Sequence, residues 1–164
     1  AGVTERATFV KADLFETDFS KAQVITMFLL PSINLRLRPK ILDMRPGTRI
    51  VSNSFTMDNW QADETSTLGG DCTSWCTAML NIVPAQVAGT WRAGSSDLTL
   101  AQAFQIVSGT LGTTAIAEGR LNGEQLTFKA GATQYAARVV GDRIEGTATT
   151  AGKQESWSAT RNPR

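Results

Sequence analysis

The stretch Ala22–Phe55, AQVITMFLLPSINLRLRPKILDMRPGTRIVSNSF, decides the fold expected for this chain. An almost unbroken apolar run, Val24–Leu30, ends at Pro31 and is typical of a buried strand. Apolar side chains at helical spacing follow, and a Pro46-Gly47 stop separates them from a second short apolar run. Strands that are apolar on both faces and joined by a crossover helix belong to a parallel sheet covered by helices. The first third is therefore predicted to be α/β.

The composition favours a folded core and gives no electrostatic sign of a partner. The chain has 164 residues, of which 41% are hydrophobic, and this is enough for a real core. Sixteen basic residues against 15 acidic ones leave a net charge of +1, so neither nucleic acid nor a charged membrane surface is expected as a partner. The longest apolar run is far shorter than the roughly 20 residues that a membrane span needs.

Histidine is absent from the sequence. Its absence removes His-based catalytic triads, His metal sites and the usual proton shuttle near neutral pH, and no metal site is expected. Cys72 and Cys76 are four residues apart. In an extended segment their Cα atoms would lie about 13 Å apart, beyond the ~7 Å limit for a disulfide, so pairing requires a turn. We expect buried or incidental thiols rather than a disulfide.

The sequence begins Ala1-Gly2-Val3, without an initiator Met, a basic leader or an apolar signal core. We therefore expect the chain to be a processed product or a fragment of a longer protein. The sequence leaves the localisation open between the bacterial cytoplasm and export.

Polar residues at strand ends are the first candidates for a site. Ala7–Asp13 resembles a short strand, and ligands of open α/β sheets bind outside the carboxyl ends of strands. Asp13 is equally well explained as the cap of a turn. Ser32 is predicted to be the N-cap of the helix. Pro39 predicts that this helix begins late, near Arg38, or breaks there.

The second half of the chain has the character of an all-β region. Residues 61–74 are loop-like, and 75–84 are predicted to be a strand. Short alternating runs then repeat 18 residues apart, with Asn122-Gly123 and Gly141-Asp142 as tight turns between strands. Residues 87–161 are predicted to form an antiparallel meander of about five to seven strands, curled like a small barrel or half-barrel.

The change of character defines two predicted domains. The first, residues 1–86, is the α/β part, and the second, 87–164, is the β-rich part. Trp91, Phe104 and Trp157 are expected to fill the core of the second domain. This domain has a small hydrophobic content, so it is predicted to pack against the first.

Five landmarks of the first half form a recognisable pattern: Asp13-Leu14-Phe15, Leu29-Leu30-Pro31, Leu35–Lys40, Pro46–Arg49 and Phe55–Trp60. Together they resemble the second half of a bacterial group of Rossmann-like S-adenosylmethionine-dependent methyltransferases, related to the lysine methyltransferases that act on the ATP synthase c subunit. The stretch IVPAQVAGTW at 82–91 and the β-rich tail are similar to the same group. The resemblance therefore covers nearly the whole chain.

The resemblance implies S-adenosylmethionine as the cofactor of the full-length enzyme. Such enzymes hold the methionine part of the cofactor on a Gly-rich loop, and no GxGxG occurs in this sequence. Asp13 and Leu14 fall at the position that usually holds the adenine, and Leu29 and Pro31 fall at the strand end where the methyl acceptor approaches. The four are therefore the candidate cofactor-binding residues. Weak or absent cofactor binding is expected of this chain by itself.

Methyl transfer from a sulfonium needs positioning and a site that desolvates a neutral amine more than it needs acid–base groups. The absence of histidine is compatible with that chemistry. No catalytic residue is assigned, and Ser32 and Asn34 are weak candidates to orient an acceptor amine. Each of them is as readily explained by a structural role.

Three functional hypotheses follow from the sequence. The first is a portion of a methyltransferase that acts on a protein or small-molecule amine. The second is a non-catalytic module that binds an apolar ligand or partner through aromatic residues of the tail, namely Trp91, Phe104, Tyr135 and Trp157. The third is self-association, for instance as a homodimer, through an exposed strand edge and apolar face of the sheet.

Overall fold

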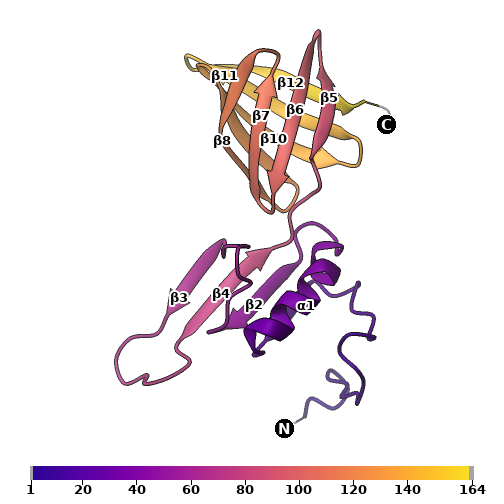
Figure 1. The fold of residues 1–164 in the computed structure, drawn as a ribbon, viewed down its shortest axis with the longest axis vertical. Helices are drawn as coiled ribbons and strands as arrows, with labels where there is room; N and C mark the ends of the chain where they lie inside the picture. The colour runs from indigo at the N-terminus through magenta and orange to yellow at the C-terminus, as the bar shows by residue number, and fades with distance from the viewer. Residues whose placement is uncertain (1, 163–164) are drawn as a thin grey trace.

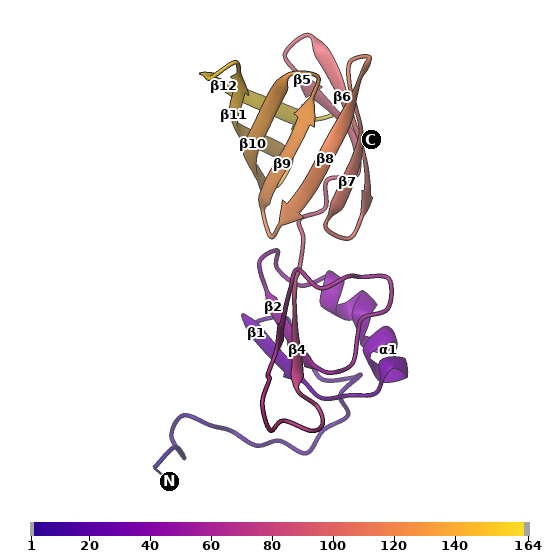
Figure 2. The same ribbon diagram turned by 90° about the vertical axis from the view of Figure 1, so that its left-hand side faces the viewer.

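The computed structural model describes residues 2–162, which form a small mixed sheet with one helix and, joined to it, a closed β-barrel (Figures 1 and 2). The elements of the sheet part are β1 (Val24–Met27), α1 (Pro31–Leu42), β2 (Arg49–Asn53), β3 (Glu64–Thr67) and β4 (Thr77–Ile82). The barrel strands are β5 (Gly89–Ala93), β6 (Ser96–Ala103), β7 (Ile106–Leu111), β8 (Thr114–Asn122), β9 (Gln125–Ala130), β10 (Thr133–Val140), β11 (Arg143–Thr150) and β12 (Lys153–Arg161).

The sheet has the strand order β1-β2-β4-β3. The pair β1 and β2 is parallel and connected through α1, as predicted, whereas β4 runs antiparallel to both β2 and β3. Alternate residues of β2 face the helix, so Ile50 and Ser52 are buried against it. Leu37 and Ile41 of α1 complete that side of the core. The prediction of a parallel sheet covered by helices therefore holds for one strand pair and one face.

The helix α1 differs from the prediction at its start. Pro31 is its first residue and Leu30 is the N-cap, so the prediction that Ser32 caps the helix is wrong. Proline suits the first helical position because the N–H of that position has no intrahelical partner. The helix runs on past Pro39 to Leu42, so the predictions of a late start near Arg38 or a break there are also wrong. Pro39 has no backbone N–H, so the helix lacks one hydrogen bond there. Leu37 and Ile41, on either side of Pro39, are buried in the core, and their packing favours a continuous helix.

The predicted strand at Ala7–Asp13 does not form. Phe9 and Val10 within it are 94% and 75% exposed. A strand requires a neighbour for its backbone hydrogen bonds, and among residues 2–162 no strand runs beside this segment. The loop prediction for 61–74 is wrong at Glu64–Thr67, which pairs with β4 as an edge strand.

The cysteines form a disulfide, so the expectation of incidental thiols is wrong. The Cα atoms of Cys72 and Cys76 lie 6.0 Å apart because the chain turns between them. Trp75, inside this turn, has a left-handed backbone with φ of 57°. The separation calculated for an extended segment therefore does not apply here.

Residues 89–161 form an up-and-down antiparallel barrel that closes between β12 and β5. The alternating pattern and the hairpins were predicted correctly, but the barrel has eight strands and is closed, so the estimate of strand number was low. The 18-residue repeat corresponds to the hairpins β8–β9 and β10–β11. Gly123 and Gly141 occupy the left-handed positions of their turns, each with φ of 58°.

The barrel interior is filled by side chains from all its strands. Trp91 is fully buried there, as predicted, together with Leu126 and Phe128, and Trp157 is half-buried against them. Phe104 does not belong to this core, so that prediction is wrong. It lies in the tight turn between β6 and β7 and packs against the core of the sheet part.

The two parts are joined by specific contacts as well as by residues 83–88. The ring of Phe104 stacks on that of Trp60, with centroids 5.9 Å apart. Next to it, the buried Gln105 donates from Nε2 to the Gln61 carbonyl oxygen at 2.7 Å. The tip of the β6–β7 hairpin therefore holds the segment that follows β2. The predicted domain boundary after residue 86 stays a prediction about folding units.

Candidate functional site

The carboxyl ends of β1 and β2 lie at one edge of the sheet because the two strands are parallel. The segment before β4 reaches the same edge because β4 runs in the opposite direction. Ligands of open α/β sheets bind at such an edge. Two features occur there, an apolar pocket and a group of exposed aromatic rings.

The pocket has a volume of about 380 Å³ and lies between the loop 14–19, β1 with the residues after it, and the helix α1. Its lining is almost entirely apolar: Leu14, Thr17, Phe19, Ile25, Thr26, Met27, Phe28, Leu29, Leu37 and Ile41. Leu14 and Leu29, two of the predicted cofactor-binding residues, both line this pocket although they are far apart in the sequence.

The other two predicted cofactor-binding residues are not among the lining residues. Asp13 caps a turn, because its Oδ1 accepts a hydrogen bond from the Phe15 N–H at 2.8 Å. Its backbone oxygen also accepts from the Thr17 N–H at 2.9 Å. Pro31 begins α1 and is exposed. The turn-cap alternative thus describes the contacts of Asp13, and the cofactor role of all four residues stays a prediction.

The helix α1 fastens the loop that forms one wall of the pocket. Lys40 donates from Nζ to the carbonyl oxygens of Phe15 at 2.9 Å and Thr17 at 2.7 Å. The guanidinium of Arg36 lies 3.8 Å from the ring centroid of Phe15. At the end of the loop, a hydrogen bond from the Ser20 backbone N–H lowers the pKa of the Asp18 carboxyl. Positive side chains of one helix therefore hold the loop against the sheet.

The two weak candidates for orienting an acceptor lie in different surroundings. Ser32 is exposed on the first turn of α1. Asn34 is fully buried, and its Nδ2 donates to the carbonyl oxygens of Phe55 at 3.4 Å and Thr56 at 3.2 Å. Its Oδ1 has no hydrogen-bond partner within residues 2–162. Asn34 therefore fixes the loop after β2, which is a structural role that leaves one acceptor atom free.

Three aromatic side chains meet at the same edge, and we call Phe28, Phe55 and Trp75 the aromatic trio. The ring centroids of Phe28 and Phe55 lie 5.7 Å apart, and Trp75 is 5.3 Å from each of them. Phe28 is 54% exposed, Trp75 is 56% exposed, and Phe55 is half-buried. Sequence reasoning missed this group, because Phe28 and Trp75 were assigned to apolar runs of buried strands. The available signal was an aromatic residue near the end of the first run and at the start of the second.

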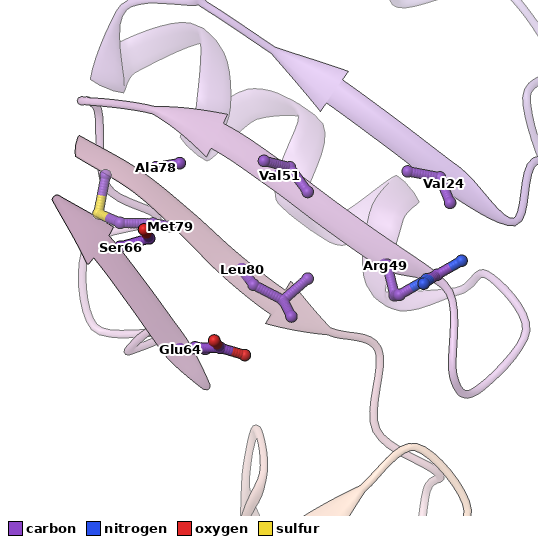
Figure 3. Close-up of a pocket in the computed structure, with 8 residues that line it drawn as sticks. All are labelled: Val24, Arg49, Val51, Glu64, Ser66, Ala78, Met79 and Leu80. Atoms are coloured by element: carbon purple, nitrogen blue, oxygen red, sulfur yellow. The ribbon is translucent and has the colours of Figure 1, made fainter. Parts of the chain in front are cut away.

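The face of the sheet opposite α1 is open. Figure 3 shows Val24, Val51 and Leu80 on neighbouring strands of this face, with Arg49 and Glu64 beside them. They line a shallow apolar depression of about 300 Å³. Separately, none of the helices in residues 2–162 has the length and apolar character needed to cross a membrane.

Comparisons with known proteins concern mainly the first part of the chain. Residues 1–64 match the family described as the ANTKMT methyltransferase domain. A protein-lysine N-methyltransferase of Saccharolobus islandicus (strain REY15A) is 48% identical over 64 residues, which are 38% of this chain and 40% of that protein. The chain therefore matches less than half the length of this curated relative.

Among solved structures, an RNA methyltransferase from Salinibacter ruber in complex with S-adenosyl-L-homocysteine is similar, with 41% identity and a TM-score of 0.43. The similarity covers 48% of this chain and 49% of that one. The family match and the curated relative support the predicted resemblance to methyltransferases.

Proposed function

We propose that residues 1–64 form the acceptor-side part of a Rossmann-like S-adenosylmethionine-dependent methyltransferase whose acceptor is an amine of a protein. The observation that carries this proposal is the apolar pocket beside the carboxyl end of β1, with Leu14 and Leu29 in its walls. The pocket lies in the segment that matches the methyltransferase family. The name of the curated relative supports a protein lysine as the acceptor.

The pocket suits one portion of the proposed cofactor. Its volume of about 380 Å³ lies at the lower end of small-molecule sites, and its leucine, phenylalanine and methionine side chains provide apolar contact for a purine ring. The ribose and the methionine part need polar groups and a Gly-rich loop, and the sequence contains no GxGxG. We therefore propose that this chain by itself binds the cofactor weakly and is inactive.

When bound, S-adenosylmethionine supplies a methyl group on a positively charged sulfur. The residues of this chain would contribute position and exclusion of water, which are the main requirements of such a displacement. Lys40 holds the loop over the pocket through two carbonyl oxygens. Asn34 holds the loop after β2, on the side from which the acceptor would approach.

The pocket can be tested by titrating the chain with S-adenosylhomocysteine while observing leucine methyl groups by NMR. The methyl groups of Leu14 and Leu29 should shift at millimolar ligand, and Leu29→Asp should abolish the shift at Leu14. Leu68→Asp, at an exposed position outside the pocket, is the matched control and should change nothing. Binding at micromolar concentration would contradict the proposed need for a Gly-rich loop. Shifts confined to other residues would reject the pocket.

A second proposal, self-association through the sheet, is supported by the open apolar face in Figure 3 and by β1 and β3, which each pair on one side only. Sedimentation velocity should then show a dimer that Val51→Lys disrupts, and a monomer at all concentrations would reject it. The aromatic residues of the tail give no such support for ligand binding. Trp91 and Tyr135 are buried in the barrel, and Phe104 lies in the junction.

A further inference from the structure

We propose that the aromatic trio of Phe28, Phe55 and Trp75 receives the amine group of the acceptor and sets the preference for a cationic side chain. This inference rests on the proposed methyltransferase function and adds the residues that recognise the acceptor. The starting observation is that three rings lie in mutual contact at 5.3 to 5.7 Å while two of them remain more than half exposed. Aromatic rings that contact one another are usually buried.

The position of the aromatic trio fits this role. Phe28 directly follows β1, Phe55 follows β2, and Trp75 precedes β4, so all three gather at the ligand-binding edge of the sheet. Phe28 also lines the apolar pocket, together with Leu14 and Leu29. The aromatic trio is therefore continuous with the proposed cofactor pocket, and an acceptor held on it would lie next to that pocket.

The rings are held in place by two residues with an unfavourable backbone conformation, by a disulfide and by a hydrogen bond. Trp75 and Ser54, next to Phe55, have left-handed backbones with φ of 57° and 60°. Such conformations are unfavourable for residues other than glycine and gather at functional sites. The disulfide between Cys72 and Cys76 closes the turn that carries Trp75. Asn34 holds the carbonyl oxygen of Phe55. Scattered surface aromatics would need none of these supports.

The chemistry of aromatic rings points to the occupant. The faces of Phe and Trp rings carry negative potential, and they attract ammonium and methylammonium groups in preference to neutral chains of the same shape. A lysine side chain offers a four-carbon apolar stem and such a group. The name of the curated relative, a protein-lysine N-methyltransferase, agrees with this choice.

The test uses the full 164-residue chain and three small probes, without cofactor. They are the amides of N-acetyl-lysine, N-acetyl-trimethyllysine and N-acetyl-norleucine, the last being a neutral chain of similar length. We expect both cationic probes to shift the indole N–H resonance of Trp75 saturably. Norleucine amide should bind at least about threefold more weakly, which corresponds to the cation–π attraction at an exposed site.

Variants separate recognition from folding. Trp75→Leu should abolish the preference for the cationic probes, whereas Trp75→Phe, which keeps an aromatic face, should retain it. For these variants the reporter is the side-chain resonances of Phe28. The matched control is Phe9→Leu, which removes an exposed aromatic ring outside the aromatic trio and should leave binding unchanged. The thermal midpoint of each variant verifies folding.

The outcomes distinguish this inference from the proposed function. Equal binding of norleucine and lysine amides would overturn the amine site, and so would an unshifted Trp75 resonance at the highest soluble probe concentration. Either result leaves the cofactor test at Leu14 and Leu29 unaffected. Conversely, amine binding at the aromatic trio without any response of the pocket to S-adenosylhomocysteine would reject the proposed function and keep only an amine-binding surface.

Discussion

The sheet part and the barrel are stabilised in different ways. In the barrel each strand pairs on both sides, and the strands themselves supply the buried core. In the sheet, within residues 2–162, β1 and β3 pair on one side only, α1 covers one face, and Phe104 from the barrel packs against the core. The barrel strands therefore supply most of their own core, while the core of the sheet part also uses a side chain from the barrel. The candidate pocket and the aromatic trio both belong to the sheet part.

The largest loss of stability is expected from a substitution that leaves a cavity in the barrel. Trp91 is fully buried and donates from Nε1 to the Val87 carbonyl oxygen at 2.8 Å. Trp91→Ala should lower the free energy of unfolding by about 4 kcal/mol, from lost burial and the cavity left behind. Denaturant unfolding followed by circular dichroism measures this loss. Trp157 is half-buried, so Trp157→Ala should lower the free energy of unfolding clearly less than Trp91→Ala does. Equal losses would contradict the assignment of Trp91 to the centre of the core.

A smaller loss of stability, which also affects the sheet part, is expected from substitutions at the tip of the β6–β7 hairpin. Phe104→Ala removes the ring that stacks on Trp60 and should lower stability by about 2 kcal/mol, below the range for fully buried rings because Phe104 is half-buried. The φ of Phe104 is 55°, so Phe104→Gly should be less damaging than Phe104→Ala by about 1 kcal/mol, the lower end of the cost of a left-handed backbone.

Hydrogen exchange locates this effect. Amides of β2 and β4 should exchange faster in both Phe104 variants, while those of β10 and β11 keep their protection. Uniform acceleration in both parts would mean that the chain unfolds as one unit and would contradict the dependence of the sheet on the barrel.

Removal of the disulfide is expected to lower stability locally. Replacing both Cys72 and Cys76 by alanine should cost about 2 kcal/mol, the loop-entropy value for so short a loop, within the β3–β4 region. The barrel should keep its stability. In the variant the indole resonance of Trp75 should broaden because the turn is no longer closed. An unchanged resonance would show that Ser54, Asn34 and their contacts suffice to hold the aromatic trio.

The sequence predicts features governed by local pattern and misses those governed by distant contacts. Alternation and turn glycines predicted the hairpins of the barrel, and the apolar run at Val24 predicted β1 together with its parallel partner. The number of barrel strands and closure between β12 and β5 depend on a pairing across about 70 residues, which no local pattern encodes. The failed strand at Ala7–Asp13 has the same cause, since a strand needs a neighbouring strand and the local pattern does not show whether one is present.

The candidate site was predictable only in part. Leu14 and Leu29 were identified through the resemblance, and the fold brings them into the lining of one pocket. The aromatic trio was not predicted because its members come from three separate segments and meet only when the sheet forms. The disulfide was rejected on the assumption of an extended chain, and the left-handed Trp75 invalidates that assumption.

The smallest effect concerns the loop over the pocket. Asp18 is exposed, and the pKa of its carboxyl is lowered in the folded chain, mainly because the Ser20 backbone N–H donates to it. A pKa that is lower in the folded state gives stabilisation that is complete above the unfolded value and is lost as the pH falls through the folded value. The loop should therefore loosen only below about pH 4.

An NMR titration of the Asp18 carboxyl carbon measures this pKa directly. Ser20→Ala removes the contribution of the hydroxyl and keeps that of the backbone, so the pKa should rise part of the way toward 3.8. Asp18→Asn should remove the acid-dependent loosening without affecting the barrel. A wild-type pKa at or above 3.8 would show that the Ser20 hydrogen bond does not persist in solution. In that case the contacts of Lys40 and Arg36 would be left to hold this wall of the pocket.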